Sequence, residues 1–251
     1  MALALDIFEN SGLNFVVRWA HVLVGIMWIG LLYYFNFVQV PAFAQLDAGA
    51  RNQAIDKLAS RALWWFRWAA LATLLFGLLI GFIPLTDEGD GAFLTEGYFK
   101  SAAGLSISTG MLLGITMFLN VWGVIWRNQK VVIANARNVL AGGEADPNAA
   151  AAGRKGLLAS RQNTIYSFTM LLFMVGTSHF FGLGGFDTTE NRGIYWAITG
   201  VLWLVLELNC LGVIGGTGQN ATNWIYEDHK RAIGAGLVLV VVWYALWEII
   251  F

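Results

Sequence analysis

The sequence predicts an all-α integral membrane protein, a bundle of six transmembrane helices with short amphipathic surface helices and both termini on the outer side. Hydrophobic residues make up 57% of the chain and charged residues only 12%, whereas soluble proteins carry about 25% charged residues. The mean hydropathy is +0.61. Apolar stretches also recur six times along the 251 residues, each close to the ~20 residues that cross a bilayer.

The six predicted spans form a single membrane domain, 1–251. Five of them are centred on stretches without Asp, Glu, Lys or Arg, and the fifth in chain order is broken only by Glu207. Pro41 and Pro84 fall at span ends and Pro147 falls in a loop, where a missing amide donor costs least. The predicted spans cover residues 15–40, 64–85, 100–126, 163–183, 193–216 and 232–250.

The basic residues predict the orientation, because Lys and Arg concentrate in cytoplasmic loops. Twelve of the 15 fall in one set of loops, and only Arg18, Lys100 and Arg192 fall in the other. The chain is therefore expected in the inner (cytoplasmic) membrane, with its N-terminus and C-terminus periplasmic and the acidic loop 86–90 outside. The twelve are Arg51, Lys57, Arg61, Arg67, Arg127, Lys130, Arg137, Arg154, Lys155, Arg161, Lys230 and Arg231.

Three loop segments have patterns of their own. Residues 45–63 and 128–140 mix apolar and charged residues at helical spacing, which predicts short amphipathic helices on the cytoplasmic surface. Residues 141–160 contain Gly142, Gly143, Pro147 and an alanine run. This composition predicts a flexible cytoplasmic connector between two groups of three spans.

Composition excludes several classes of function. The net charge is −1, so nothing indicates a nucleic-acid partner. The single cysteine, Cys210, excludes an internal disulfide, a CxxC zinc site and the CxxCH attachment of a c-type haem. A phosphate-binding glycine loop, a Ser-His-Asp arrangement and an HExxH motif are also missing from the sequence. The remaining chemistry is redox or proton chemistry within the membrane, or none.

Two histidines lie at similar predicted depths near the outer surface, His21 in the first span and His179 in the fourth. Gly25 and Gly176 lie one helical turn inward of them, which would leave room for a planar ring. The pattern suggests axial ligands to the iron of a haem b, with Ser178 able to orient an imidazole. The alternative is that each histidine hydrogen-bonds near the interface, or contacts lipid headgroups or the other histidine.

Other polar residues in the spans have competing interpretations. Arg18 lies one turn outward of His21 and could hold a haem propionate, a quinone oxygen or an anionic substrate, or could reach the lipid headgroups. Glu207, near the middle of the predicted fifth span, is the candidate catalytic proton group, and its alternative is a buried interhelical hydrogen bond. Asn120 and Asn163 are interpreted as caps at span ends.

Several stretches resemble the N-terminal membrane domain of the membrane-bound bacterial urate oxidase (urate hydroxylase) family. They are "RWAHVLVGIMWIGLLYYFNFV" from Arg18, "GITMFLNVWGVIWRNQKVVIA" from Gly114, "GGEADP" from Gly142 and "RQNTIYSFTMLLFMVGTSHF" from Arg161. Together they cover about half of the chain, in the order of the family pattern. The resemblance carries over Arg18, His21, Trp28, Gly30, Asn128, Lys130, Asn163, Tyr166, Ser178 and His179.

The chain departs from that family at two points. Gln162 stands where family members usually have a histidine, and the extra spans and C-terminal cytochrome c domain of the family have no counterpart before Phe251. The resemblance therefore implies a shortened relative that would pass electrons to a separate carrier.

These observations predict a membrane oxidoreductase-type or electron-transfer subunit that binds haem b near the periplasmic face. Its expected partners are the lipid bilayer and either other membrane subunits or a separate electron carrier. The alternative is a non-catalytic accessory subunit of a larger membrane complex, and the sequence leaves open whether the chain is itself part of an enzyme and whether urate is involved.

Overall fold

The computed structural model of the chain describes residues 6–84 and 91–251, so the predicted acidic loop 86–90 lies outside the described residues. Every regular element in the described part is helical. Six helices there are long and apolar enough to cross a membrane. The predicted all-helical class and the expected six helices of membrane-spanning length are therefore confirmed, while their insertion in a membrane stays a prediction.

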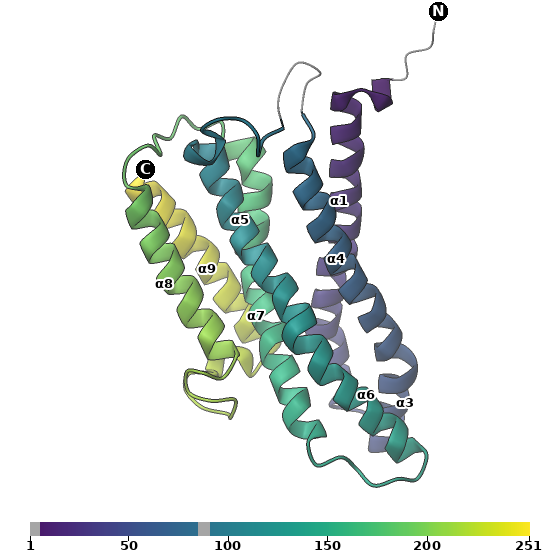
Figure 1. Cartoon of the computed structure of the whole chain (residues 1–251). Helices are drawn as coiled ribbons and strands as arrows, with labels where there is room; N and C mark the ends of the chain where they lie inside the picture. The colour runs from purple at the N-terminus through teal and green to yellow at the C-terminus, as the bar shows by residue number, and fades with distance from the viewer. Residues whose placement is uncertain (1–5, 85–90) are drawn as a thin grey trace, which may run out of the picture.

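The helices follow one another as long antiparallel rods (Figure 1). The first half contains η1 (Asp6–Phe8), α1 (Asn10–Tyr33), η2 (Tyr34–Gln39), α2 (Val40–Phe43), α3 (Ala48–Ala54), η3 (Ile55–Ala59), α4 (Ser60–Phe82), η4 (Tyr98–Lys100), α5 (Ala102–Leu119), η5 (Asn120–Ile125) and α6 (Trp126–Leu140). The second half contains α7 (Ala149–Gly176), η6 (Thr177–Phe181), α8 (Arg192–Cys210), η7 (Trp224–Tyr226) and α9 (His229–Ile250).

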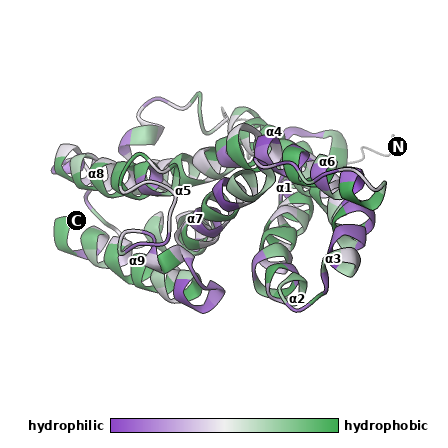
Figure 2. Ribbon diagram, turned by 90° about the horizontal axis from the view of Figure 1, so that it is seen from below, coloured by the Kyte–Doolittle hydropathy of each residue, from purple (hydrophilic) through white to green (hydrophobic). Residues whose placement is uncertain are grey.

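Helix α7 lies at the centre of the bundle. It packs against α5, α6 and α9 and also touches α1 and α8, and Figure 2 shows it between the α8 and α9 side and the α1 and α4 side. In its most apolar stretch 56% of the residues are buried inside the protein, against 17% for the first span. Polar side chains on α7 therefore face other helices, where they need hydrogen-bond partners.

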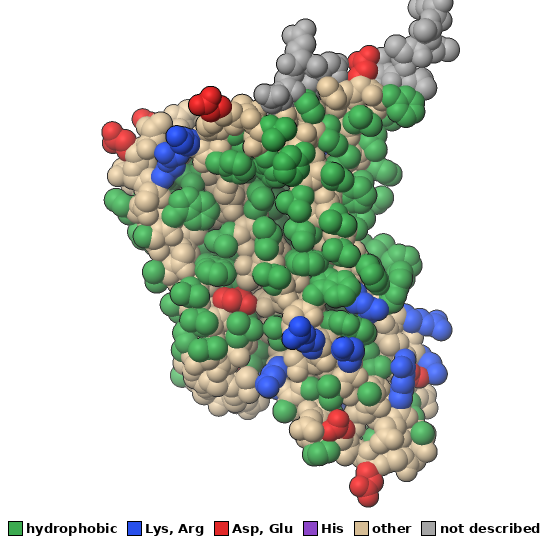
Figure 3. Space-filling model, viewed as in Figure 1, with side chains coloured by type: hydrophobic (Ala, Val, Ile, Leu, Met, Phe, Trp, Pro, Cys, Tyr) green, Lys and Arg blue, Asp and Glu red, His purple; other side chains and the backbone are tan. Residues whose placement is uncertain are grey.

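The two ends of the bundle differ in charge. The start of α1 and the end of α9 lie at one end (Figure 1). At the opposite end Lys and Arg side chains gather below an apolar band (Figure 3), and this end carries α3, α6 and the start of α7. We call it the basic end. The grouping of basic loops follows the prediction, while the side of the membrane on which they lie stays a prediction.

Four long helices contain or adjoin π-helical turns. In such a turn the backbone N–H groups bond to carbonyls five residues earlier, and the extra residue rotates the following side chains around the helix axis. The π-helical turn η2 directly precedes Pro41. Because Pro41 has no backbone N–H to donate to the carbonyl one turn earlier, the regular α-helical hydrogen bonding is interrupted there. Segment η5 contains Asn120, and η6 contains His179. Each of these π-helical segments therefore carries a polar residue into or out of the bundle at a defined position.

The surface segments differ from the prediction. Residues 45–63 and 128–140 are mostly helical, but their helices continue directly into α4 and from η5, so they extend the spans lengthwise. The predicted flexible connector 141–160 is a loop only up to Asn148, because the alanine-rich run from Ala149 is a strong helix former and packs against α6. Asn138 and Asn135 also hydrogen-bond to the loop backbone at Glu144 and Asp146.

The fifth span is shorter than predicted. Helix α8 ends at Cys210, and Gly212 follows with a φ of 78°. The Val213 amide donates to the Leu208 carbonyl at 2.9 Å, and the Gly212 amide donates to the Asn209 carbonyl, which is the hydrogen-bond pattern of a glycine C-cap. Glu207 therefore lies in the last turn of α8 and not near the middle of the span.

Candidate functional site

A cluster of buried polar side chains lies between α8, α7 and η5. We call it the Glu207 cluster, and its members are Asn120, Gln162, Asn163, Glu207 and Tyr226. Asn120 Nδ2 donates to Asn163 Oδ1 at 3.0 Å and to Glu207 Oε2 at 3.3 Å. Asn163 Nδ2 donates to the Met117 carbonyl at 2.9 Å. The side-chain amide of Asn120 thus connects the Glu207 carboxylate of α8 to η5 and α7.

The backbone explains how these side chains meet. Asn120 is the first residue of η5, and its side chain is buried. Asn163 is fully buried near the middle of α7, and Glu207, in the last turn of α8, accepts a hydrogen bond from Asn120. Asn120 is therefore an interhelical donor to the Glu207 carboxylate, and Asn163 accepts a second hydrogen bond from Asn120, so their interpretation as helix caps was wrong.

Tyr226 connects the cluster to the basic end. Its hydroxyl donates to Gln162 Oε1 at 2.5 Å and lies 3.4 Å from the Leu206 carbonyl. Tyr226 belongs to the short segment η7 outside the spans, and burial raises the pKa of its hydroxyl. The hydroxyl therefore stays protonated and acts as a hydrogen-bond donor at neutral pH.

Three buried polar atoms around the cluster have no hydrogen-bond partner among the described residues. They are Arg161 Nε, Gln162 Nε2 and Asn209 Oδ1. Such atoms are costly to bury alone, and buried water typically satisfies groups of this kind with two to four hydrogen bonds. These three atoms are therefore unused hydrogen-bond donors and acceptors beside the Glu207 cluster.

Glu207 has no cationic partner. Only 8% of the residue is exposed, and none of the salt bridges formed by the described residues includes it. Arg154 pairs instead with Glu227, with Nη2 2.5 Å from Oε1. An ionised carboxylate is expensive to bury without a counter-charge, so a change in the charge of Glu207 must be coupled to a proton.

His21 packs against α4. Its Nδ1 lies 2.9 Å from the Thr73 carbonyl, and its ring covers Gly77, where an added Cβ would lie 2.9 Å from Cε1. The carbonyl fixes the proton on Nδ1 and leaves Nε2 as the free electron pair. A Cβ at Gly25 would meet the Thr73 methyl group at 3.8 Å, so that side is in ordinary contact.

His179 lies in η6 and is exposed. Its Nδ1 is 3.0 Å from the Val175 carbonyl of its own helix, which again leaves Nε2 free. The space beside Gly176 is filled by the Phe181 ring, 2.7 Å from where a Cβ would lie, and Ser178 is exposed. No hydrogen bond or ring contact of the described residues joins the two histidines.

The donor atoms of both histidines therefore fit metal ligation, whereas the space expected beside Gly176 is filled by the Phe181 ring and Gly25 faces the Thr73 methyl group. Within residues 6–84 and 91–251 no group of three or more His, Cys, Asp or Glu gathers as a metal site. The haem b expected from the sequence stays a prediction.

Arg18 has a structural contact. Its Nη2 donates to Asn14 Oδ1 at 3.3 Å, and Asn14 Nδ2 in turn donates to the Ile83 carbonyl at 2.7 Å. Asn14 thereby satisfies a carbonyl at the end of α4, where a positive charge is also favourable. The guanidinium remains exposed and can still meet an anion.

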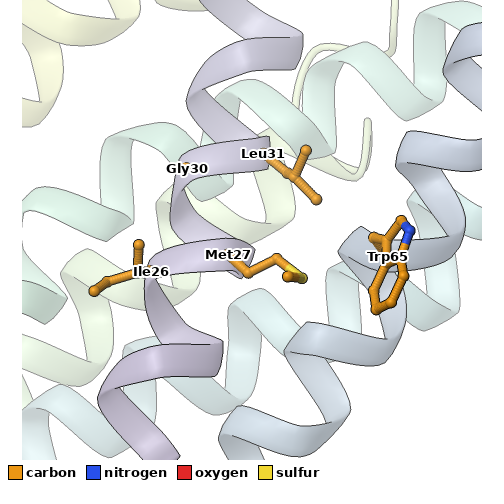
Figure 4. A pocket seen from close by; sticks show the side chains of 5 residues that line it. All are labelled: Ile26, Met27, Gly30, Leu31 and Trp65. Atoms are coloured by element: carbon orange, nitrogen blue, oxygen red, sulfur yellow. The ribbon is translucent and has the colours of Figure 1, made fainter.

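A shallow hollow between α1 and α4 is a weaker candidate. Its lining residues are Ile26, Met27, Gly30, Leu31 and Trp65, and Figure 4 shows the Met27 and Leu31 side chains of α1 extending toward Trp65 of α4. All five residues present apolar atoms to the hollow, and the side chains of Ile26 and Trp65 are exposed. No polar side chain lines it to orient a ligand.

The sequence contains a signal for the buried polar residues that were interpreted as helix caps. The stretch 163–169 places Asn, Thr, Tyr and Ser within a predicted span, and the helix that contains α7 has the lowest mean hydropathy of the six helices long enough to cross a membrane. A polar spanning helix is typical of the centre of a bundle. No known family, curated protein or solved structure matches this chain, and the resemblance to the urate oxidase membrane domain stays a prediction.

Proposed function

We propose that this chain is the membrane-embedded subunit of an oxidoreductase and that Glu207 is its proton-exchange group. The observation that carries the proposal is a buried carboxylate held by Asn120 without any cation within reach. Intramembrane carboxylates of this kind are typical of proton relays. The redox part of the proposal comes from the sequence resemblance and from the two histidines.

The cluster supports a route for the proton. Tyr226 and Gln162 form a short hydrogen-bonded pair between the basic end and Glu207, and the unpartnered atoms of Gln162 and Asn209 can anchor water between them. Asn120 holds the carboxylate in one position and donates to it whether or not it carries a proton. A proton can thus pass from the basic end to Glu207 while the apolar band above stays closed.

Infrared spectroscopy of the protein in lipid nanodiscs tests this proposal. A protonated carboxylic acid has a C=O stretching band, whereas surface Asp and Glu are ionised at neutral pH. We expect such a band at neutral pH in the native protein, its loss when the pH is raised, and its absence in Glu207→Gln.

Glu190→Gln is the matched control, because Glu190 is exposed in the loop between η6 and α8 and its replacement should leave the band unchanged. A native spectrum without the band, or a band that survives Glu207→Gln, would contradict the proposal and favour a non-catalytic accessory subunit.

A second function is favoured by the free Nε2 atoms of His21 and His179. Either histidine could hold a haem b, which would supply one-electron transfer. A reduced-minus-oxidised optical spectrum of the purified protein should then show a haem b band that is lost in His21→Ala or His179→Ala. His229→Ala, which changes the third histidine outside the spans, should keep it. A spectrum without any haem band would exclude this function.

A further inference from the structure

A second cavity lies at the basic end, where η2, α4, α6 and α7 meet. Its volume is about 200 Å³, below the ~300–1,000 Å³ of pockets for drug-sized ligands, so it can hold a single substituted ring. We call it the basic-end pocket. The residues that line it include Phe35, Gln39, Phe66, Gln129, Gly156 and Ser160.

Aromatic and basic side chains place this pocket at the depth of a membrane interface. The Arg67 guanidinium lies 3.9 Å from the centre of the Trp126 ring, and Trp122 Nε1 donates to the Arg67 carbonyl at 3.2 Å. Phe66 is the neighbour of Arg67 in α4. Because Trp and Arg mark the membrane interface, the pocket lies where the polar ring of a lipid-soluble molecule would lie.

The walls of the pocket select an uncharged ring. No Lys, Arg, Asp or Glu lines it. Phe35 and Phe66 form an edge-to-face pair with centroids 5.3 Å apart, and Leu63 and Leu157 add aliphatic surface. A charged ligand would find no counter-charge here, whereas an apolar ring would gain contact with both phenyl groups.

Polar atoms on different helices can orient a ring that binds in the pocket. Gln39 Oε1 is buried and has no hydrogen-bond partner among the described residues. Across the pocket the Gln129 amide lies over Gly156, with Nε2 3.3 Å from where a Cβ would lie. Ser160 Oγ accepts from Asn36 Nδ2 at 2.8 Å, which leaves its own proton available. The pocket is therefore lined by an unused acceptor on η2 and by donors on α6 and α7.

We propose that the basic-end pocket binds the ring of a quinol, with one ring hydroxyl donating to Gln39 Oε1. This inference rests on the proposed oxidoreductase function, because quinols are lipid-soluble carriers of electrons and protons. The pocket and the Glu207 cluster share α7: Ser160 precedes Asn163 by three residues, which places the two residues on neighbouring turns of one face.

Binding of decylubiquinol to the native protein in nanodiscs, measured calorimetrically without oxygen, tests the proposal. We expect saturable binding that becomes about tenfold weaker in Gln39→Leu, because one hydrogen bond to a buried group is lost. The same variant should unfold no more easily than the native protein, since it removes an unpartnered buried acceptor. Gln45→Leu, which changes an exposed glutamine, should bind as the native protein does.

Equal binding of decylubiquinol by Gln39→Leu, or equal binding of decylbenzene by the native protein, would overturn the quinol site. Glu207→Gln should bind decylubiquinol normally, so the two proposals fail separately. A native protein that shows the infrared band of Glu207 but does not bind decylubiquinol would keep the proposed function and overturn this inference.

Discussion

Trp247→Ala is expected to lower the free energy of unfolding by about 3–5 kcal/mol, the usual cost of truncating a buried tryptophan. Trp247 is fully buried in α9. Its ring lies 4.7 Å from that of Phe181 and 5.7 Å from that of Tyr195, measured between centroids. These contacts join α9 to η6 and α8, so the substitution would open a cavity where three elements meet. Denaturation in mixed micelles measures the change.

Trp19→Ala is the matched control, because Trp19 lies on α1 and is 57% exposed. Its replacement should change the free energy of unfolding by no more than about 0.5 kcal/mol. Equal losses in the two variants would show that the ring cluster around Trp247 does not hold α9 in place.

Asn163→Leu is expected to lower the free energy of unfolding by about 1–3 kcal/mol. The substitution keeps a side chain of similar size but removes the acceptor for Asn120 and the donor to the Met117 carbonyl. Both partners are buried, so their lost hydrogen bonds cannot be replaced by bulk water. The infrared band of Glu207 should also shift, because Asn120 becomes free to rotate away from the carboxylate.

Asn128→Leu serves as the control for Asn163→Leu. Asn128 is partly exposed and donates only to the Val124 carbonyl of its own helix at 2.8 Å, so its replacement should cost no more than about 0.5 kcal/mol and leave the infrared band unchanged. An Asn163→Leu protein as stable as the native one would contradict the assignment of the cluster as an interhelical tie.

The helices could be predicted from the sequence because apolar length alone decides whether a segment can cross a membrane. The residues at which the helices begin and end were less predictable. The fifth span appeared to continue to residue 216 because its sequence stays apolar, but Gly212 adopts a left-handed conformation and ends α8 after Cys210. The alanine-rich start of α7 was predicted as a linker because its packing against α6 is a tertiary contact.

The site residues were only partly predictable for the same reason. Glu207 was identified because a carboxylate in an apolar span is rare. Its partners Asn120 and Asn163 lie 87 and 44 positions away in the sequence, and no periodicity connects them. Equal depth suggested that His21 and His179 face each other, but depth says nothing about rotation around the helix axis. In the structure the first contacts α4 and the second is exposed.

Labelling with dicyclohexylcarbodiimide tests the central claim most directly. This apolar reagent reacts with protonated carboxylic acids in membranes and spares ionised carboxylates in water. We expect mass spectrometry of native membranes labelled at neutral pH to find the adduct on Glu207, a raised pH to suppress it, and Glu190, which is exposed outside the spans, to stay unmodified. An unmodified Glu207, or an adduct whose yield does not change with pH, would contradict the assignment of Glu207 as the proton-exchange group.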